Sequence, residues 1–169
     1  MLISATLLIV YLPTLLPGVG YTGDTAALQF VGKILGTAHE TGYPTYILLN
    51  HLFASLIPFS SLAYKANLLS ALASIVACSF LFRILCQLDI RWWVSCLTAI
   101  TFGLTPTLWS QSVVAEVYSL NILFVSLAVY FFIKWHQAHD DRNFYAACAA
   151  YACSFGNHLT MITFLPAIL

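Results

Sequence analysis

Two carboxylates stand beside apolar segments, where acid–base chemistry would be possible. The first is Asp24, which follows "VGYTG" and precedes "TAALQFVGKILG". The apolar residues of the latter recur at helical spacing (Ala27, Leu28, Val31, Ile34 and Leu35), which predicts a short surface helix beginning at Asp24 or Thr25. Asp24 would then either cap this helix, worth ~1 kcal/mol, or present a rigidly held base. The sequence leaves both roles open.

The second carboxylate is Glu116, within a long apolar run. If a helix begins near Ser110, Glu116 lies ~9 Å along it. Ser112, Ser119 and Ser126 then share its face. Such a polar stripe serves either helix–helix hydrogen bonding or a functional cavity, because an ionisable group at membrane depth is costly.

Histidines supply further candidates. His158 lies beside Asn157 in "SFGNHLTMITF", within an apolar run, and could be a packed or a functional side chain. His39 falls in the turn "AHETGYP", where a solvated loop and a binding site are both possible. Convergence on a divalent metal is conceivable for Asp24, Glu116 and these histidines. However, no compact ligand spacing such as H-E-x-x-H occurs, so we expect no metal and no cofactor.

The composition places these residues in a membrane protein. Of 169 residues, 61% are hydrophobic and only 7% are charged, against roughly 25% in soluble domains. Six basic and six acidic residues give no net charge, so no nucleic-acid partner is expected. The five cysteines lie in apolar runs without C-x-x-C spacing, which favours buried free thiols.

The apolar runs predict an all-α integral membrane protein with about five transmembrane helices. We expect the spans near 2–17, 63–85, 92–104, 110–135 and from 144 to 169. Segment 43–59 predicts an interfacial or re-entrant helix within a long first outer loop, residues 18–65. Because the chain stops inside an apolar run, we expect residues 1–169 to be the N-terminal membrane portion of a longer protein, inactive by itself.

Basic residues predict the orientation. Two loops that fall on one side of a five-helix count carry most of them (Arg83, Arg91, Lys134 and Arg142), so this side is expected to be cytoplasmic. The loop 18–65 would then face the periplasm or the lumen. The expected location is a bacterial inner membrane or the endoplasmic reticulum.

Five motifs together resemble one known family. These are "LLPGVGYTGDTAALQ", "GTAHETGYPTYILLNHLF", "KANLLSALAS", "TPTLWSQSVVAEVYSLN" and "FGNHLT". They look like the transmembrane protein O-mannosyltransferase-like family of the glycosyltransferase C superfamily, whose members use polyprenyl-phosphate sugars. The resemblance implies catalytic roles for Asp24 and Glu116. It also matches His158 of "GNH" and the "H-x-x-GYP" element containing His39 and Tyr43.

The chemistry implied by this resemblance is transfer of mannose, or a similar hexose, to a hydroxyl of a protein or glycan at the outer face. A lipid-phosphate donor needs a base for the acceptor, here Asp24, and cationic groups for the departing phosphate. We expect substrate binding by His39, Tyr43, Lys33, His158 and Asn157, with Lys65 as a further hydrogen-bond donor to the phosphate. The family usually has proline where this chain has Glu40, and distant relatives have Asp-Glu where it has Asp24-Thr25.

Two other functions remain open. A transporter could use Glu116 and His158 as an ion or proton path, although no internal repeat is visible. A non-catalytic membrane subunit is the third alternative, but it would leave the polar residues of the outer loop without a role.

Overall fold

The computed structural model describes residues 2–21, 23–38 and 42–168, and within these ranges the chain is helical without a strand. His39 and Glu40 therefore lie outside the described residues. The elements, in chain order, are α1 (Leu2–Thr14), α2 (Thr25–Ile34), α3 (Pro44–Leu56), α4 (Leu62–Gln87), α5 (Trp92–Gly103), α6 (Pro106–Ser112), α7 (Val117–Ala138), α8 (Asp141–Phe155), the 3₁₀ helix η1 (Leu159–Phe164) and α9 (Leu165–Ile168).

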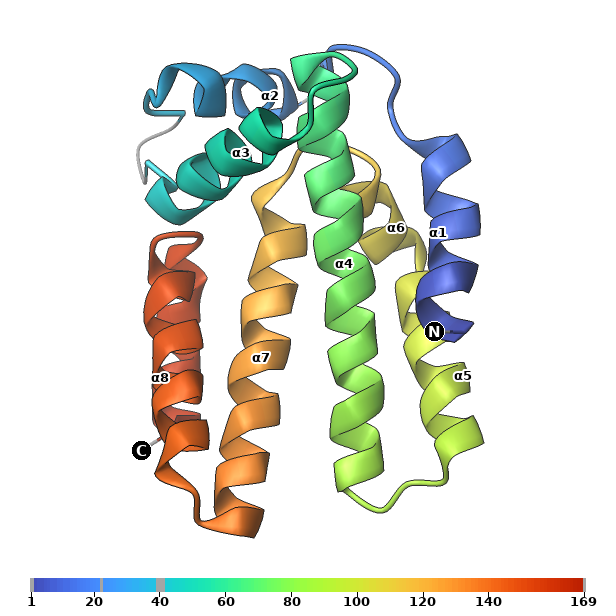
Figure 1. Ribbon diagram of the computed structural model, residues 1–169, viewed down its shortest axis with the longest axis vertical. Coiled ribbons are helices and arrows are strands. Elements are labelled where there is room, and N and C mark those ends of the chain that lie inside the picture. Colours follow the sequence, from blue (N-terminus) through green and yellow to red (C-terminus); the bar gives the residue numbers. More distant parts are fainter. Residues whose placement is uncertain (1, 22, 39–41, 169) are drawn as a thin grey trace.

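Helix α4 is the central element, and α1, α5 and α7 pack along it (Figure 1). Its buried positions are mostly small, including Ala66, Ser70, Ala73, Ser74 and Ala77. Small side chains let neighbouring helices approach closely, as membrane helices require where lipid gives no hydrophobic drive for association. Where α6 meets α4, the hydroxyls of Ser112 and Ser74 are hydrogen-bonded across 2.7 Å.

Two short helices, α2 and α3, form a layer across one end of α4 and α7 (Figure 1). This agrees with the predicted short helix after Asp24 and the predicted non-spanning helix near 43–59. The apolar stripe predicted for the first is only partly correct. Leu28 and Val31 are buried, whereas Ile34 and Leu35 are more than half exposed, and Leu35 ends the helix in the left-handed conformation.

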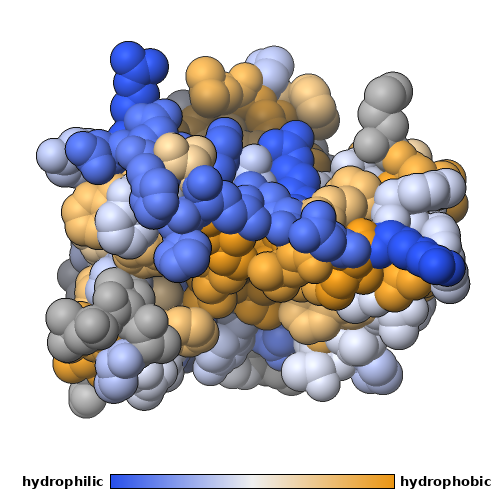
Figure 2. All heavy atoms as spheres, turned by 90° about the horizontal axis from the view of Figure 1, so that it is seen from below, coloured by the Kyte–Doolittle hydropathy of each residue, from blue (hydrophilic) through white to orange (hydrophobic). Residues whose placement is uncertain are grey.

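The loops α4–α5 and α7–α8 both lie at the opposite end, where the side chain of Gln137 donates to the carbonyl of Gln87 across 2.8 Å. Figure 2 views this end and shows polar residues running across it, with apolar residues around them. The loops predicted to share one side of the membrane therefore do lie together, away from α2 and α3. Which side is cytoplasmic stays a prediction.

Within the described ranges, two helices, α4 and α7, are long and apolar enough to cross a membrane. Helices α1 and α5 are apolar but have 13 and 12 residues, or ~20 Å, against a hydrocarbon core of ~30 Å. Of the five predicted spans, only the second and fourth therefore contain a helix of spanning length. The five cysteines are free, as expected, but only Cys78 and Cys96 are buried; Cys86 and Cys148 are partly buried and Cys153 is exposed.

The fourth and fifth predicted spans are both interrupted. The fourth divides at Val113–Glu116, so that Ser112 belongs to α6 whereas Ser119 and Ser126 belong to α7. The predicted continuous serine face is therefore wrong, although all three serines are buried. The fifth ends at Phe155, and after Gly156–His158 the chain continues as η1, which packs back on α8 through the bond from the Tyr151 hydroxyl to the Met161 carbonyl.

Candidate functional site

A buried polar network holds α2 in place. The side chain of Gln29 accepts from the Gly20 amide across 2.9 Å and donates to the Asn67 side chain across 3.0 Å. Asn67 in turn donates to the carbonyl of Leu16 across 2.7 Å. Both side chains are almost fully buried. Because satisfied buried hydrogen bonds are costly to break, this network fixes the start of α2 against α4.

Asp24 occupies the N-cap position of α2, as predicted, but its carboxylate makes no capping hydrogen bond. Only its backbone carbonyl takes part in the helix, accepting from the Leu28 amide across 2.9 Å. The half-buried carboxylate is therefore not used for capping. This removes the capping interpretation and leaves the side chain available for chemistry.

Glu116 lies in extended backbone immediately before α7, not within a membrane helix as predicted. Its Oε1 accepts a hydrogen bond from the Thr25 hydroxyl across 3.0 Å. Its backbone is held by Ser70 of α4, whose hydroxyl accepts from the Glu116 amide (3.2 Å) and donates to the Glu116 carbonyl (3.4 Å). The break between α6 and α7 thus brings Glu116 beside the first residue of α2, next to Asp24.

The electrostatics of this pair keep Glu116 less acidic than usual. Burial raises the pKa of the Glu116 carboxyl, and the nearby charge of Asp24 raises it further, whereas the Thr25 hydroxyl lowers it by donating to the charged form. Burial also raises the pKa of the Tyr46 phenol, with a smaller contribution from Glu116. The Tyr46 hydroxyl is fully buried and has no hydrogen-bond partner among the described residues.

His158 lies in the turn between α8 and η1, not within a membrane helix as expected. The centroid of its ring lies 6.2 Å from that of Tyr43, which precedes α3, in a stacked arrangement. It lies 5.5 Å from that of Tyr118, in the first turn of α7, with the rings tilted by 43°. His158 Nδ1 lies 2.7 Å from the Thr160 hydroxyl and 3.3 Å from the Thr160 amide, so Thr160 holds this edge of the ring.

Asn157 anchors the same turn. Its amide donates to the Val117 carbonyl across 3.0 Å, and the residue is fully buried. Next to it, Gly156 accepts from the Thr45 amide across 2.9 Å, joining this turn to the start of α3. In the structure Asn157 thus positions the turn that carries His158. Its side-chain oxygen has no partner within the described part of the chain.

The two lysines predicted to bind phosphate, Lys33 and Lys65, lie away from the start of α2, where Asp24 and Glu116 meet. Lys33 is exposed in the last turn of α2, ~12 Å along the helix from Thr25. Lys65 is buried and donates to the Ala54 carbonyl across 3.2 Å, near the end of α3. Of the predicted phosphate-binding residues that the structure describes, His158 is the one that lies beside the start of α7, the helix that Glu116 precedes. No group of three metal-ligating side chains occurs among the described residues.

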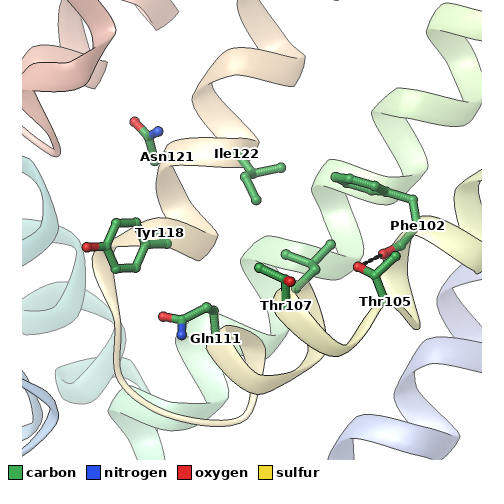
Figure 3. Close-up of a pocket in the computed structure, with 8 residues that line it drawn as sticks. Phe102, Thr105, Thr107, Gln111, Tyr118, Asn121 and Ile122 are labelled. Atoms are coloured by element: carbon green, nitrogen blue, oxygen red, sulfur yellow. Dashed lines mark hydrogen bonds between the residues drawn. The ribbon is translucent and has the colours of Figure 1, made fainter. Parts of the chain in front are cut away.

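A pocket of about 410 Å³ adjoins the site, between the end of α5, α6 and the first turns of α7 (Figure 3). Tyr118 belongs to its wall and also to the ring cluster around His158. The wall is mainly apolar, with Phe102, Leu108 and Ile122. It also contains two amides, Gln111 and Asn121, whose buried oxygens have no partner among the described residues.

Four residues of the site were not found from the sequence: Thr25, Tyr46, Ser70 and Tyr118. Thr25 follows a predicted catalytic residue, and Tyr118 belongs to the quoted "AEVYSLN", so both were within reach of the motifs. Ser70 and Tyr46 carry no local signal, because their roles arise from tertiary contacts with the start of α7.

The fold and the site together define a helical protein with helices of membrane-spanning length and two carboxylates at one end. Residues 24–169 match the family described as the Protein O-mannosyl-transferase TMEM260 N-terminal domain, so the chain belongs to this family. This confirms the resemblance seen in the motifs.

Two curated relatives carry the corresponding name. The mouse Protein O-mannosyl-transferase TMEM260 is 36% identical over 162 residues, which cover 94% of this chain and 22% of the relative. The Dictyostelium discoideum Protein O-mannosyl-transferase tmem260 is 25% identical over 174 residues, covering 94% of this chain and 21% of the relative. The chain thus spans about a fifth of these relatives. No solved structure matches it.

Proposed function

We propose that this chain is the N-terminal membrane portion of a multi-pass, glycosyltransferase C-like enzyme. The enzyme transfers mannose from a polyprenyl-phosphate donor to a protein hydroxyl at the outer or lumenal face of its membrane. The observation that carries this proposal is the meeting of Asp24 and Glu116 at the end of the molecule formed by α2 and α3. The names of the relatives support the reaction class.

Asp24 is the residue suited to act as the base. Its half-buried side chain makes no capping hydrogen bond, and an acceptor hydroxyl could reach it from the aqueous side. Glu116 shares the site, but its carboxylate already accepts from Thr25 and its backbone is fixed by Ser70. A carboxylate held in this way is suited to orient Asp24 or the acceptor.

His158 is the residue suited to the departing phosphate. With Nδ1 held by Thr160, Nε2 is the ring nitrogen suited to donate to an anionic oxygen. The starts of α2, α3 and α7 surround the same region, and helix starts favour negative charge through their unpaired N–H groups. The mainly apolar pocket beside Tyr118 (Figure 3) suits the first isoprene units of a lipid donor.

The transporter alternative gains no support from this arrangement. Glu116 precedes α7 and His158 follows α8, so neither lies inside a helix of spanning length, where the sequence had placed an ion path. The names of the relatives favour the transferase.

The test is Asp24→Asn in the full-length protein, with sugar transfer from polyprenyl-phosphate mannose measured alongside thermal stability. We expect a loss of ~10²–10⁴-fold in transfer rate, because an amide cannot take the acceptor's proton, and little change in stability, because no capping bond is lost. Asp89→Asn is the matched control: Asp89 is exposed at the opposite end, and asparagine tolerates its left-handed backbone. Equal transfer rates for both variants would contradict the role of Asp24.

A further inference from the structure

Thr25 is the one side chain seen to hydrogen-bond the Glu116 carboxylate within the described residues. It is the first residue of α2 and is only 2% exposed. Its hydroxyl donates to Glu116 Oε1 across 3.0 Å, and this bond joins segments 91 residues apart in sequence. A buried hydrogen bond to a charged acceptor is stronger than one between neutral groups. Thr25 therefore has a specific partner, beyond starting a helix.

The rotamer of Thr25 is fixed by packing. Gly20 lies so close that any Cβ at that position would overlap the Thr25 methyl group. The methyl therefore fills the space beside Gly20, and the hydroxyl is directed at Glu116. Ser70 fixes the other partner, since it bonds both the amide and the carbonyl of Glu116. Both ends of the bond are thus held by the fold before any substrate arrives.

We propose that Thr25 is a positioning residue: its hydroxyl binds Oε1 of the Glu116 carboxylate and thereby directs the other carboxylate oxygen into the site. With Oε1 occupied by Thr25, Oε2 is the atom left to contact the acceptor or the sugar. The hydroxyl at position 25 thereby favours the charged form of a carboxylate that burial tends to neutralise.

The groups that face Glu116 come from several elements. Asp24, at the start of α2, carries the like charge, and Tyr46 of α3 is the nearby phenol. Helix α4 contributes the uncharged Ser70. His158, in the turn after α8, contacts Tyr118 and not Glu116 among the contacts of the described residues. Since burial raises the pKa of Glu116 and the charge of Asp24 raises it further, the Thr25 hydroxyl is the contact that opposes both.

The test compares Thr25→Val, which keeps the shape but removes the donor, with Thr25→Ser, which keeps the donor. Because the pKa of Glu116 is raised in the folded state, the contribution of this group to stability is fully present below its ordinary pKa. That contribution is lost as the pH rises through the folded-state pKa. Removing the donor raises the folded-state pKa further, so Thr25→Val should lose more stability over this pH range than the parent. In the full-length protein, the difference in Tm between parent and Thr25→Val should therefore widen from about pH 4 to about pH 7.

Thr25→Ser should follow the parent across this range. In a Glu116→Gln background, the difference caused by Thr25→Val should become independent of pH, because the titrating group is gone. A gap that is constant with pH in the parent background would overturn the proposal, since a purely structural threonine behaves in that way. A gap that still widens without Glu116 would also overturn it.

A second readout rests on the proposed function. If Glu116 works in its charged form, Thr25→Val moves the acid limb of the transfer rate to higher pH, and Thr25→Ser restores it. An unmoved limb in an enzyme that otherwise transfers sugar would overturn the catalytic part of the proposal. If the parent transfers no sugar but the Tm difference between the parent and Thr25→Val still widens with pH, the proposed function fails and the pairing of Thr25 with Glu116 stands.

Discussion

Gly156 provides a sharp test of how the turn carrying His158 is attached to α3. Its backbone is ordinary (φ −73°, ψ −8°), so alanine could adopt it without strain. An added Cβ, however, would overlap the Thr45 hydroxyl and lie 3.4 Å from the Pro44 ring. Gly156→Ala therefore probes the close approach between two segments and not the flexibility of glycine.

The magnitude follows from three contributions. Replacing glycine with alanine at a compatible backbone gains about 0.4–1 kcal/mol through the unfolded state. Against this, Thr45 must turn away and lose its 2.9 Å bond to the Cys153 carbonyl, about 0.5–1.5 kcal/mol. Inserting a methyl group into a packed junction costs a further 1–3 kcal/mol or so. The expected result is a loss of about 2 kcal/mol.

The assay is denaturant unfolding of the protein in detergent, arranged as a double-mutant cycle. In a Thr45→Ala background the obstructing hydroxyl is absent, so Gly156→Ala should cost less than about 1 kcal/mol. In a Thr45→Val background the bulk remains and the cost should persist. Gly18→Ala is the control, because a Cβ there meets nothing within 4 Å. An undiminished loss in the Thr45→Ala background would refute the proposed contact between these segments.

Two further predictions concern the site itself. Asn157→Ala should lower the free energy of unfolding by about 1–3 kcal/mol, because the Val117 carbonyl loses its buried donor; unchanged denaturant unfolding would contradict this bond. Glu116→Gln should leave the fold intact but slow sugar transfer, since Glu116 orients and does not attack. Mass spectrometry of the parent protein with donor should then show no glycosyl–Glu116 adduct, and trapping one would make Glu116 the nucleophile.

The elements around the site were predictable where the sequence has local signals. The helix at 25–34 follows from its apolar spacing, and the helix at 44–56 begins at Pro44, a residue favoured at the first helical position. The pairing of the two basic loops followed from counting apolar runs. The two helices depend on residues close together in sequence, so local sequence patterns were enough to predict them.

The break before α7 was missed because "SVVAEV" contains neither proline nor glycine. What interrupts the helix is tertiary: the Val113 carbonyl accepts from the Leu16 amide across 2.9 Å, and Ser70 bonds the Glu116 backbone. These partners satisfy backbone groups that a helix would otherwise pair. The break after α8 did have a local signal, since Gly-Asn commonly ends a helix. Apolar content outweighed that signal in the prediction of one continuous span.

These breaks explain how a chain with so few charges can build a polar site. Asp24 precedes α2, Tyr43 precedes α3, Glu116 precedes α7 and His158 precedes η1. Each position is a helix start, where N–H groups lack partners within the helix and favour negative charge. A helix start lowers the cost of placing a partly buried carboxylate there only where the carboxylate accepts from its N–H groups, and an incoming phosphate would meet the same favourable field. The arrangement is therefore compatible with the proposed transfer at the end of the helices.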